Sequence, residues 1–318
     1  MYVVGVDAGG TSTRACAVDE NVHVLGTGRA GGANPNSHPP DKAAAAIAEA
    51  VAAATADLDR SELAHCVVGM AGSSKLTDPA IANLFDRTWR DAGLGSSPHI
   101  VSDAETAFAS ATDAPDGTVL VSGTGSIAGR IRDHRMVSVA GGYGWLLGDE
   151  GSGYWIGREA VRATLDALTG RAPLGPLATA VLDEAGIEVT EPRAFHRLIT
   201  VVNQHVPVQL ARFAPLVSAA ASTTGGRRAP ADPVAARIVD DTAAWLAETA
   251  LAAREPDETT PIVLVGSVLG AGSPVRARVH DRLRSHDVRE SKDGVLGAAW
   301  LAALKGFGQH VPHPNRVG

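Results

Sequence analysis

Short apolar runs alternate with polar, glycine-rich turns along the first third of the chain. These runs are rich in valine and other β-branched residues and are bounded by turn residues, which is the pattern of buried strands. Strands are predicted at residues 2–6, 14–18, 22–27, 65–69 and 99–102. Ala-rich or amphipathic stretches between them predict helices at residues 41–58 and 79–92, and a short helix after Asp103.

The same pattern restarts about 115 residues later. A second glycine-rich turn, at residues 122–126, follows an apolar run and precedes two more, as the turn at residues 7–11 does. An internal repeat of this kind constrains the whole architecture. It predicts two lobes, each opening with a β-hairpin whose tip presents backbone N–H groups.

The second half of the chain is more helical. Helices are predicted at residues 154–169, 174–185, 195–201, 208–221, 233–254, 274–283 and 294–304, with a strand at 261–265 and a polar loop at 222–230. The chain beyond Gly306 contains histidine and proline breaks and is expected to be loosely ordered. The predicted domains are a small N-terminal lobe at 1–114, a large C-terminal lobe at 115–295 and a tail at 306–318, with a helix at about 296–305 able to pack back on the small lobe.

Composition restricts the possible partners and location. The 318 residues suit two lobes of roughly 100–200 residues each, and 45% hydrophobic with 20% charged residues is typical of a soluble globular protein. A net charge of −7 argues against a nucleic-acid or anionic-membrane partner. Cys16 and Cys66 stand in strand-like runs and are expected to be buried, reduced thiols. We recognise no signal peptide or membrane-spanning run, so the cytoplasm is the expected location.

The first glycine-rich turn, Asp-Ala-Gly-Gly-Thr at residues 7–11, has the composition of a phosphate loop. Glycines allow the backbone to approach an anion closely, so that consecutive N–H groups converge on it. Asp7 could hold a hydrated Mg²⁺, and Thr11 could donate to a phosphate oxygen. A tight turn with a structural aspartate is the alternative. The second turn, Ser-Gly-Thr-Gly-Ser at 122–126, favours the phosphate interpretation, because two such hairpins can clamp the phosphates of a nucleotide.

Asp103 ends a predicted strand and precedes a helix. It could simply cap that helix, with Glu105 and Thr106 in the first turn. It could also act as a general base for a substrate hydroxyl, because ligands bind at the carboxyl ends of strands in open α/β sheets. The two roles are compatible.

Two loops have the composition of a sugar site. Residues 141–155 combine glycines and aromatic residues with Asp149 and Glu150, whose carboxylates can accept from hydroxyls. An irregular loop in which Asp149 or Ser152 caps the next helix is the alternative. Asn34 and Asn36 lie in an earlier loop and can both donate and accept, although they could equally be turn residues.

Gly266 and Ser267 follow a buried strand and lead towards a helix. A glycine there could let an adenine ring lie flat on the backbone, and an ordinary turn between a strand and a helix is the alternative.

These pieces, in this order, resemble the sugar-kinase, Hsp70 and actin superfamily. Within it they resemble the BadF/BadG/BcrA/BcrD-type ATPase family, especially its N-acetylglucosamine kinases. The resemblance runs from Tyr2 to about Leu304 and is carried by DAGGT at 7–11, SGTGS at 122–126 and GDEGSGYWIG at 148–157. It implies an α/β protein with the two-lobed actin-like ATPase (ribonuclease H-like) fold and an internal repeat.

The same resemblance assigns roles to individual residues. Asp7 would lie near Mg²⁺, and Asp103 would be the catalytic base. The residues expected to contact ATP are Gly9, Gly10, Thr11, Gly123, Thr124, Gly125, Ser126, Gly266 and Ser267. The residues expected to contact the sugar are Asn34, Asn36, Asp103, Thr124, Gly141, Gly142 and Asp149. Animal members of the N-acetylglucosamine kinase group have an asparagine after GTGS, where this chain has Ile127.

The implied activity is phosphorylation of the 6-hydroxyl of an N-acetylated hexosamine, most directly N-acetylglucosamine, by MgATP in a cytoplasmic homodimer. Glucosamine, N-acetylmuramic acid, N-acetylmannosamine and glucose stay open as substrates. One alternative is an ATPase that activates a partner enzyme through a Cys-bridged cluster, but Cys16 and Cys66 fall in predicted strands. Another is a ROK-type kinase or repressor, but the chain lacks the Cys-rich zinc motif. The third alternative is a protein that binds its ligand without catalysing a reaction.

Overall fold

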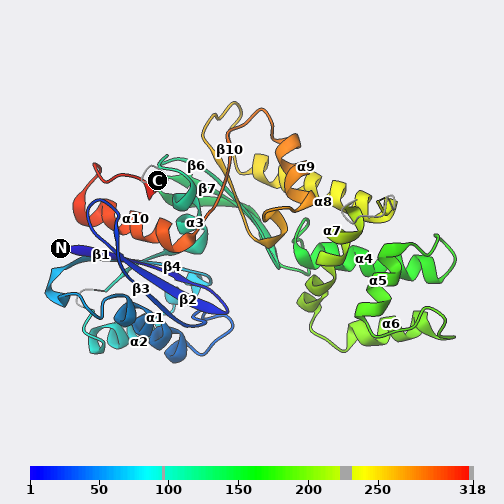
Figure 1. Cartoon of the computed structure of the whole chain (residues 1–318), viewed down its shortest axis with the longest axis horizontal. Coiled ribbons are helices and arrows are strands. Elements are labelled where there is room, and N and C mark those ends of the chain that lie inside the picture. The colour runs from blue at the N-terminus through cyan, green and yellow to red at the C-terminus, as the bar shows by residue number, and fades with distance from the viewer. Residues whose placement is uncertain (95–96, 223–230, 315–318) are drawn as a thin grey trace. The chain divides into compact units, whose positions relative to one another are not determined.

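The computed structural model describes residues 1–94, 97–222 and 231–314 (Figure 1). The predicted loop at 222–230, except Ser222, and residues 315–318 of the predicted tail lie outside the described residues. No helix in the described part of the chain is long and apolar enough to cross a membrane.

The first sheet has five strands in the order β3-β2-β1-β4-β5. The strands are β1 Tyr2–Ala8, β2 Ser12–Val18, β3 Val24–Gly31, β4 Leu63–Met70 and β5 His99–Ser102. β1 to β3 form an antiparallel meander, whereas β4 and β5 continue from β1 in parallel. The carboxyl ends of β1, β4 and β5 therefore meet at one edge of this sheet.

The second sheet repeats the first. Its order is β10-β9-β6-β7-β8, so that β6 to β10 occupy the same relative places as β1 to β5. The strands are β6 Gly117–Ser122, β7 Ser126–Arg132, β8 Arg135–Gly141, β9 Ile262–Val265 and β10 Val288–Glu290. The internal repeat predicted from the two glycine-rich turns is thus confirmed in the strand order.

Helices cover both faces of the first sheet, because β1 is apolar on both sides. They are α1 Pro40–Ala54, α2 Pro79–Asp91, α3 Asp103–Ala111 and α10 Gly294–Phe307, with 3₁₀ turns η1 Arg60–Glu62 and η2 Ser73–Thr77. Val4 packs in the core on the α1 side, and the neighbouring Val3 packs in the core on the α10 side (Figure 1). A Cβ on Gly5 would lie 2.0 Å from the backbone nitrogen of Ala299, so only glycine lets α10 cross β1 this closely.

The remaining helices pack together around one core that includes Leu120, Leu198 and Leu246. They are α4 Gly153–Leu168, α5 Pro176–Glu184, α6 Ala194–Asn203, η3 Pro207–Phe213, α7 Ala214–Ala221, α8 Pro233–Ala252, η4 Ser267–Leu269 and α9 Pro274–Arg282. A Cβ on Gly157 of α4 would lie 1.8 Å from the Leu210 carbonyl oxygen, which lets η3 cross α4 at this glycine.

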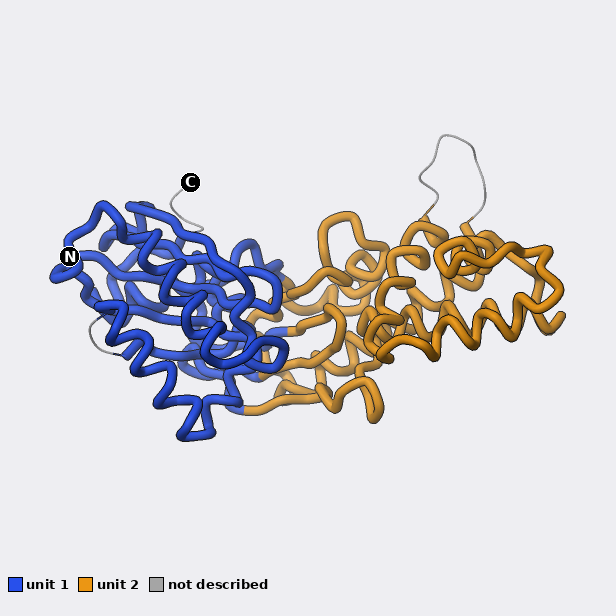
Figure 2. The backbone as a smooth tube through the Cα atoms, turned by 90° about the horizontal axis from the view of Figure 1, so that it is seen from below, with its two compact units in different colours: residues 1–119, 130–137, 289–318 blue, residues 120–129, 138–288 orange. Residues whose placement is uncertain are grey.

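The chain forms two compact units, coloured separately in Figure 2. Unit 1 comprises Met1–Val119, Arg130–Val137 and Arg289–Gly318, and unit 2 comprises Leu120–Gly129 and Ser138–Val288. The predicted lobe boundary after residue 114 falls just before β6, whose first residues belong to unit 1. The segment Arg289–Gly318, which carries α10, also belongs to unit 1.

Two local predictions need correction. The helix predicted at 208–221 is a 3₁₀ segment followed by α7, because Pro215 is tolerated best in the first turn of an α-helix. The chain beyond Gly306 is held more firmly than expected. Val311 and His313 are buried, and the His313 ring lies 2.8 Å from the Ala109 carbonyl oxygen.

Candidate active site

The first glycine-rich turn joins β1 to β2 in unit 1. The Gly9 carbonyl accepts the N–H groups of Ala33 and Asn34, at 2.9 and 3.2 Å, and the His38 ring lies 2.6 Å from the Gly10 carbonyl oxygen. These contacts hold the carbonyl side of the loop, while Gly10 and Thr11 are exposed. The loop therefore resembles an anion-binding turn whose backbone is held in place by hydrogen bonds.

Asp7 lies near the end of β1 and is part of an ion-pair chain. Its Oδ2 accepts a hydrogen bond from Arg14 Nη2 at 2.5 Å, and Arg14 Nη1 lies 2.9 Å from Asp293 Oδ1. A Cβ on Gly294 would lie 3.2 Å from Asp7 Oδ2, so the glycine leaves room beside the carboxylate. Two carboxylates therefore share one guanidinium next to the first loop.

Asp103 is the first residue of α3, but it is not the cap of this helix. Ser102 is the N-cap, because its hydroxyl accepts the Glu105 N–H at 3.2 Å and Glu105 Oε2 accepts the Ser102 N–H at 2.5 Å. The Asp103 carboxylate has local backbone contacts, in one of which Oδ1 accepts the Ala104 N–H at 3.0 Å. Ser102, and not Asp103, therefore caps α3, and the Asp103 carboxylate remains available to a ligand.

The surroundings of Asp103 suit a base. Its side chain keeps an open face to solvent, yet the neighbouring protein removes enough water to raise the pKa of the carboxyl. The carboxylates of Asp7 and Glu105 raise this pKa further, and the Ala104 N–H opposes the rise. A carboxylate with a raised pKa is a better proton acceptor than an ordinary aspartate.

The two asparagines of the loop after β3 lie together. Asn34 Oδ1 accepts the Asn36 N–H at 2.8 Å, which folds the loop back on itself. Gly72, in the left-handed conformation after β4, lies against both side chains, since its Cβ would be 2.5 Å from Asn34 Oδ1 and from Asn36 Nδ2. Met70 of β4 pairs with Ser102 of β5, so the turn that contains Gly72 and the Asp103 residue follow the carboxyl ends of neighbouring strands.

In unit 2, the second glycine-rich turn is bound to the loop that precedes α4. The Gly123 and Thr124 carbonyls accept the N–H groups of Gly153 and Tyr154, at 2.7 and 3.2 Å. The Ser126 hydroxyl donates to the Glu150 carbonyl at 2.7 Å. The turn and the loop at 148–153 therefore form one rigid element.

Asp149 is placed directly against this turn. Its Oδ1 accepts the Ser126 N–H at 3.4 Å, and a Cβ on Gly125 would lie 3.1 Å from Oδ2. Burial raises the pKa of Asp149, and the Glu150 carboxylate adds to the rise. Asp149 also has a φ of 61°, in the left-handed region that aspartate adopts more readily than most residues with a side chain.

Gly141 and Gly142 both have positive φ values, of 73° and 70°. The Gly142 N–H donates to the Ser126 carbonyl at 3.1 Å, and a Cβ on Gly142 would lie 2.6 Å from the Ile127 side chain. Glycine is required here because this segment turns sharply while lying on Ile127. The residue that replaces the family asparagine is thus in contact with a predicted sugar-binding glycine.

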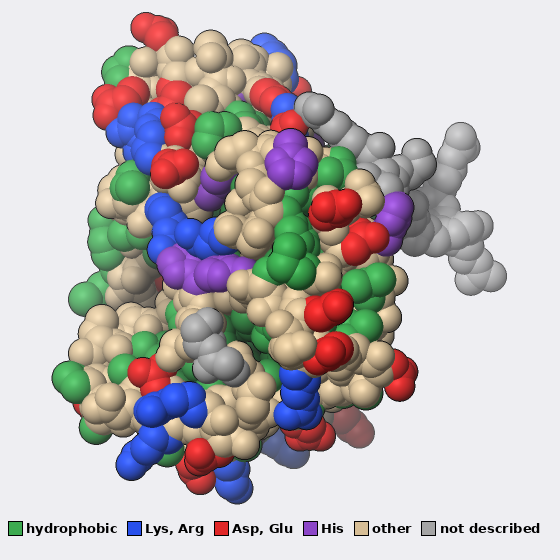
Figure 3. All heavy atoms as spheres, turned by 90° about the vertical axis from the view of Figure 1, so that its left-hand side faces the viewer, with side chains coloured by type: hydrophobic (Ala, Val, Ile, Leu, Met, Phe, Trp, Pro, Cys, Tyr) green, Lys and Arg blue, Asp and Glu red, His purple; other side chains and the backbone are tan. Residues whose placement is uncertain are grey.

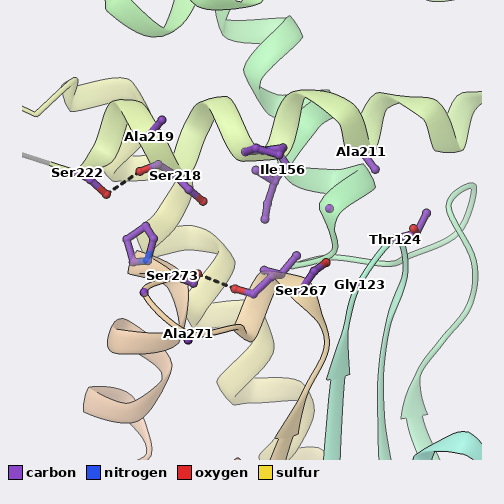
Figure 4. A pocket seen from close by; sticks show the side chains of 16 residues that line it. Gly123, Thr124, Ile156, Ala211, Ser218, Ala219, Ser222, Ser267, Ala271 and Ser273 are labelled. Atoms are coloured by element: carbon purple, nitrogen blue, oxygen red, sulfur yellow. Dashed lines mark hydrogen bonds between the residues drawn. The ribbon is translucent and has the colours of Figure 1, made fainter. Parts of the chain in front are cut away.

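A cavity of about 680 Å³ opens beside the second turn within unit 2 (Figure 4). That volume lies in the range of pockets for nucleotides and other small ligands. One wall is η4 and the loop to α9, the opposite wall is η3 and α7, and the turn closes one end. The lining residues labelled in Figure 4 are Gly123, Thr124, Ile156, Ala211, Ser218, Ala219, Ser222, Ser267, Ala271 and Ser273. Apart from Ile156, these residues have small side chains or none, which leaves room for a flat ring and its attached ribose.

Gly266 shapes this cavity without lining it. Its backbone has φ 103° and ψ 165°, a conformation that is almost restricted to glycine. A Cβ there would lie 2.2 Å from the Ser122 carbonyl oxygen. The glycine thus brings the end of β9 against the second turn and lets Ser267 line the cavity.

Sequence reasoning missed the wall contributed by η3 and α7. Ala211, Ala214, Ser218 and Ser222 recur at helical spacing with small side chains, and they line the cavity from one face. The helical spacing of these small residues was the only sign of this wall in the sequence. Small residues on one face of a helix, however, usually lie in the core of a protein.

The predicted site residues fall into two groups. Unit 1 holds Asp7, Gly9, Gly10, Thr11, Asn34, Asn36 and Asp103, and unit 2 holds Gly123, Thr124, Gly125, Ser126, Gly141, Gly142, Asp149, Gly266 and Ser267. Within each group, the residues gather around the glycine-rich turn of that unit.

Two sheets with one repeated strand order, each opening with a glycine-tipped hairpin, define the actin-like ATPase fold. The sequence profile of the BadF/BadG/BcrA/BcrD ATPase family matches residues 4–302, and the chain belongs to this family.

Individual relatives include sugar kinases. The N-acetylmuramic acid/N-acetylglucosamine kinase of Clostridium acetobutylicum is 32% identical over 185 residues, which cover 57% of this chain and 59% of that kinase. The chain thus spans about three fifths of the length of that relative. The glucosamine kinase GspK of Vibrio cholerae is 25% identical over 95% of both chains. A structure from Chromobacterium violaceum, provisionally named an N-acetylglucosamine kinase, superposes with a TM-score of 0.72 and 27% identity, covering 95% of this chain and 98% of that one.

Proposed function

We propose that this protein transfers the γ-phosphoryl group of MgATP to the 6-hydroxyl of an N-acetylated hexosamine, with N-acetylglucosamine as the preferred substrate. The observation that carries the proposal is the environment of Asp103. Ser102 caps α3, so the Asp103 carboxylate is left at the carboxyl end of β5 with a raised pKa. The relatives named as amino-sugar kinases support the choice of substrate class.

In the proposed reaction, Asp103 accepts the proton of the sugar 6-hydroxyl as the oxygen attacks the γ-phosphorus. The new O–P bond forms while the bond from the γ-phosphorus to the β,γ-bridging oxygen breaks, and ADP leaves with the electron pair of that bond. The backbone N–H groups of the two glycine-rich turns would stabilise negative charge on the phosphoryl oxygens. In phosphoryl transfer most of the catalytic effect comes from such positioning and charge stabilisation.

The residues near the first turn fit a magnesium ion that arrives with the nucleotide. Mg²⁺ commonly takes one or two protein carboxylates together with substrate phosphates and water. Asp7 supplies a carboxylate beside the loop, and Gly294 leaves room next to it. Among the described residues, no group of three or more His, Cys, Asp or Glu side chains could hold a metal alone. When bound, Mg²⁺ would neutralise charge on the ATP phosphates.

Each unit contains groups that suit a sugar. In unit 1 the proposed contacts are Asn34 and Asn36, whose amides suit the N-acetyl group and hydroxyls of the substrate. In unit 2 they are Thr124, Gly141, Gly142 and Asp149. The cavity beside the second turn would take the adenosine, with Ser267 on one wall.

The proposal is tested by measuring ADP release and sugar phosphorylation with MgATP and a panel of sugars. The panel contains N-acetylglucosamine, N-acetylmuramic acid, N-acetylmannosamine, glucosamine and glucose. We expect N-acetylglucosamine to give the highest kcat/KM. No ADP above the sugar-free control with any sugar would overturn the kinase proposal, and sugar-independent hydrolysis would favour a partner-activating ATPase. A higher kcat/KM for glucosamine would keep the kinase and change its substrate.

The raised pKa of Asp103 predicts that kcat/KM falls on the acid side of its pH profile. The base must be ionised, so kcat/KM should fall as pH drops through a pKa above the ordinary aspartate value of about 4. Turnover should be measured from pH 5 to 8 with circular dichroism to confirm folding. The control is the residual activity of Asp103→Asn. A fall in kcat/KM at low pH that persists in this variant would come from protonation of ATP and not of Asp103.

The Asp7 carboxylate predicts a change in magnesium dependence. Asp7→Asn should raise the Mg²⁺ concentration for half-maximal turnover by about 10- to 100-fold, because an amide is a poorer metal partner than a carboxylate. The matched control is Asp293→Asn, which neutralises the other partner of Arg14 and leaves Asp7 in place. Equal shifts in the two variants would mean that Asp7 acts only through Arg14.

A further inference from the structure

A second cavity lies within unit 1, away from the glycine-rich turns. It has a volume of about 170 Å³ and is formed by β5, the turn between β7 and β8, and the end of α10. Its polar lining residues are His99, Asp133, His134, Arg135, Lys305 and Gln309. We call it the β5 pocket. His99 starts β5 and Asp103 follows the end of this strand, so the β5 pocket lies at the opposite end of the strand from the proposed base.

The charges of the β5 pocket favour an anion. Arg135 and Lys305 are permanent cations in its wall, and Asp133 is the acidic residue there. Arg135 lies 4.0 Å from the nearest oxygen of Glu105, a distance that leaves its guanidinium donors largely free. Figure 3 shows histidine side chains beside Lys or Arg side chains on the surface of this unit.

Histidine nitrogens in and near the β5 pocket lack hydrogen-bond partners among the described residues. The Nε2 atom of His99 is buried, and within the described residues it has no hydrogen-bond partner. The same is true of Nε2 of His65, whose ring lies 6.3 Å from that of His99. Buried polar atoms normally have partners, so the unpaired His99 nitrogen beside a charged cavity favours a ligand there.

The pKa of His99 also reflects the positive charges around the β5 pocket. The pKa of His99 is lowered to about 4, mainly by burial and in addition by the charges of Arg135, Lys305 and His65. The groups that face His99 are His65 from β4, Lys305 from α10, and Asp133, His134 and Arg135 from the turn. A neighbouring anion would oppose this field.

We propose that the β5 pocket binds a small oxyanion of the phosphate or sulfate class, either free or as the phosphate group of a phosphomonoester. The cavity is smaller than the usual pocket for a whole metabolite, which favours a single tetrahedral group. Arg135 and Lys305 would supply the charge, and His99 and Gln309 would donate hydrogen bonds. This site is separate from the proposed active site and does not depend on the proposed function.

The test is calorimetric titration of the full chain with sulfate, inorganic phosphate and N-acetylglucosamine 6-phosphate, in saturating MgADP to fill the nucleotide site. We expect one anion per chain and at least about tenfold weaker binding in Lys305→Ala. The control is Lys42→Ala, which removes an exposed lysine from α1 and should leave the affinity unchanged. Equal affinity in wild type and Lys305→Ala, or no binding of any of the three anions, would overturn the proposal. Binding of the sugar phosphate alone, weakened in Lys305→Ala, would identify a phosphomonoester as the ligand, whereas sugar-phosphate binding that Lys305→Ala leaves unchanged would place it at the proposed active site and overturn the proposal.

A second measurement locates the anion. Sulfate does not titrate between pH 4 and 7, and its binding should raise the pKa of His99 from about 4. Binding would then take up protons, so sulfate affinity should increase as pH falls, and His99→Gln should lose this increase. The NMR signal that disappears in His99→Gln should shift on sulfate addition in wild type. A signal that stays unmoved would show that the anion binds elsewhere.

Discussion

Asp103→Asn is expected to lower kcat for sugar phosphorylation by about 10²- to 10⁴-fold while the fold stays intact. The amide cannot take the proton from the sugar hydroxyl. Its oxygen can still accept the Ala104 N–H, and Ser102 still caps α3, so the helix should keep its stability. The measurement is ADP release at saturating sugar and ATP, together with the melting temperature and the sugar dissociation constant.

Asp78→Asn is the matched control for this substitution. Asp78 stands at the start of α2 in the same unit, and its carboxylate accepts the Ala80 N–H at 2.9 Å. We expect it to retain activity within about twofold, since exposed capping contacts contribute little to catalysis and asparagine caps almost as well as aspartate. If Asp103→Asn loses no more activity than Asp78→Asn, the assignment of Asp103 as base is wrong.

Gly266→Ala is expected to disable the proposed nucleotide site of unit 2. Its backbone conformation costs about 1–3 kcal/mol for a residue with a side chain. The new Cβ would also lie 2.2 Å from the Ser122 carbonyl oxygen, so the end of β9 and the second turn must separate. We expect the KM for ATP to rise at least about tenfold, and the melting temperature to fall by about 5–10 °C.

Gly170→Ala separates backbone strain from the steric clash. Gly170 also has a positive φ, of 75°, but a Cβ there would meet no atom within 4 Å. This variant should lose only about 1 kcal/mol of stability and keep its KM for ATP. An unchanged KM for ATP in Gly266→Ala would contradict the role given to Gly266.

Local features of the fold could be predicted because they depend on neighbouring residues. The valine-rich run at the N-terminus is a strand in any setting that buries both of its faces, and β1 confirms it. The glycine-rich turns at 7–11 and 122–126 are hairpin tips because glycine permits the turn and the flanking apolar runs can pair. The repeat of these signals predicted the repeated strand order.

Side-chain relationships at the site could not be predicted in the same way. From the sequence, Asp103 could be the helix cap or a general base. Only the geometry of Ser102 and Glu105 shows that another residue supplies the cap. The ion pair of Arg14 with Asp293 joins residues far apart in the chain. The cavity wall from α7 likewise depends on how a helix packs in the core of unit 2.

The sequence by itself therefore determined the class of fold, the two hairpins and the identity of the glycines that a phosphate loop needs. Tertiary structure decided which carboxylate is left free at the end of β5, which wall encloses the cavity beside the second turn, and that His99, Arg135 and Lys305 line one pocket. The physical reason is the range of the interactions. Backbone conformation is set by residues a few positions apart, whereas hydrogen-bond partners, burial and local charge are set by segments that packing alone brings together.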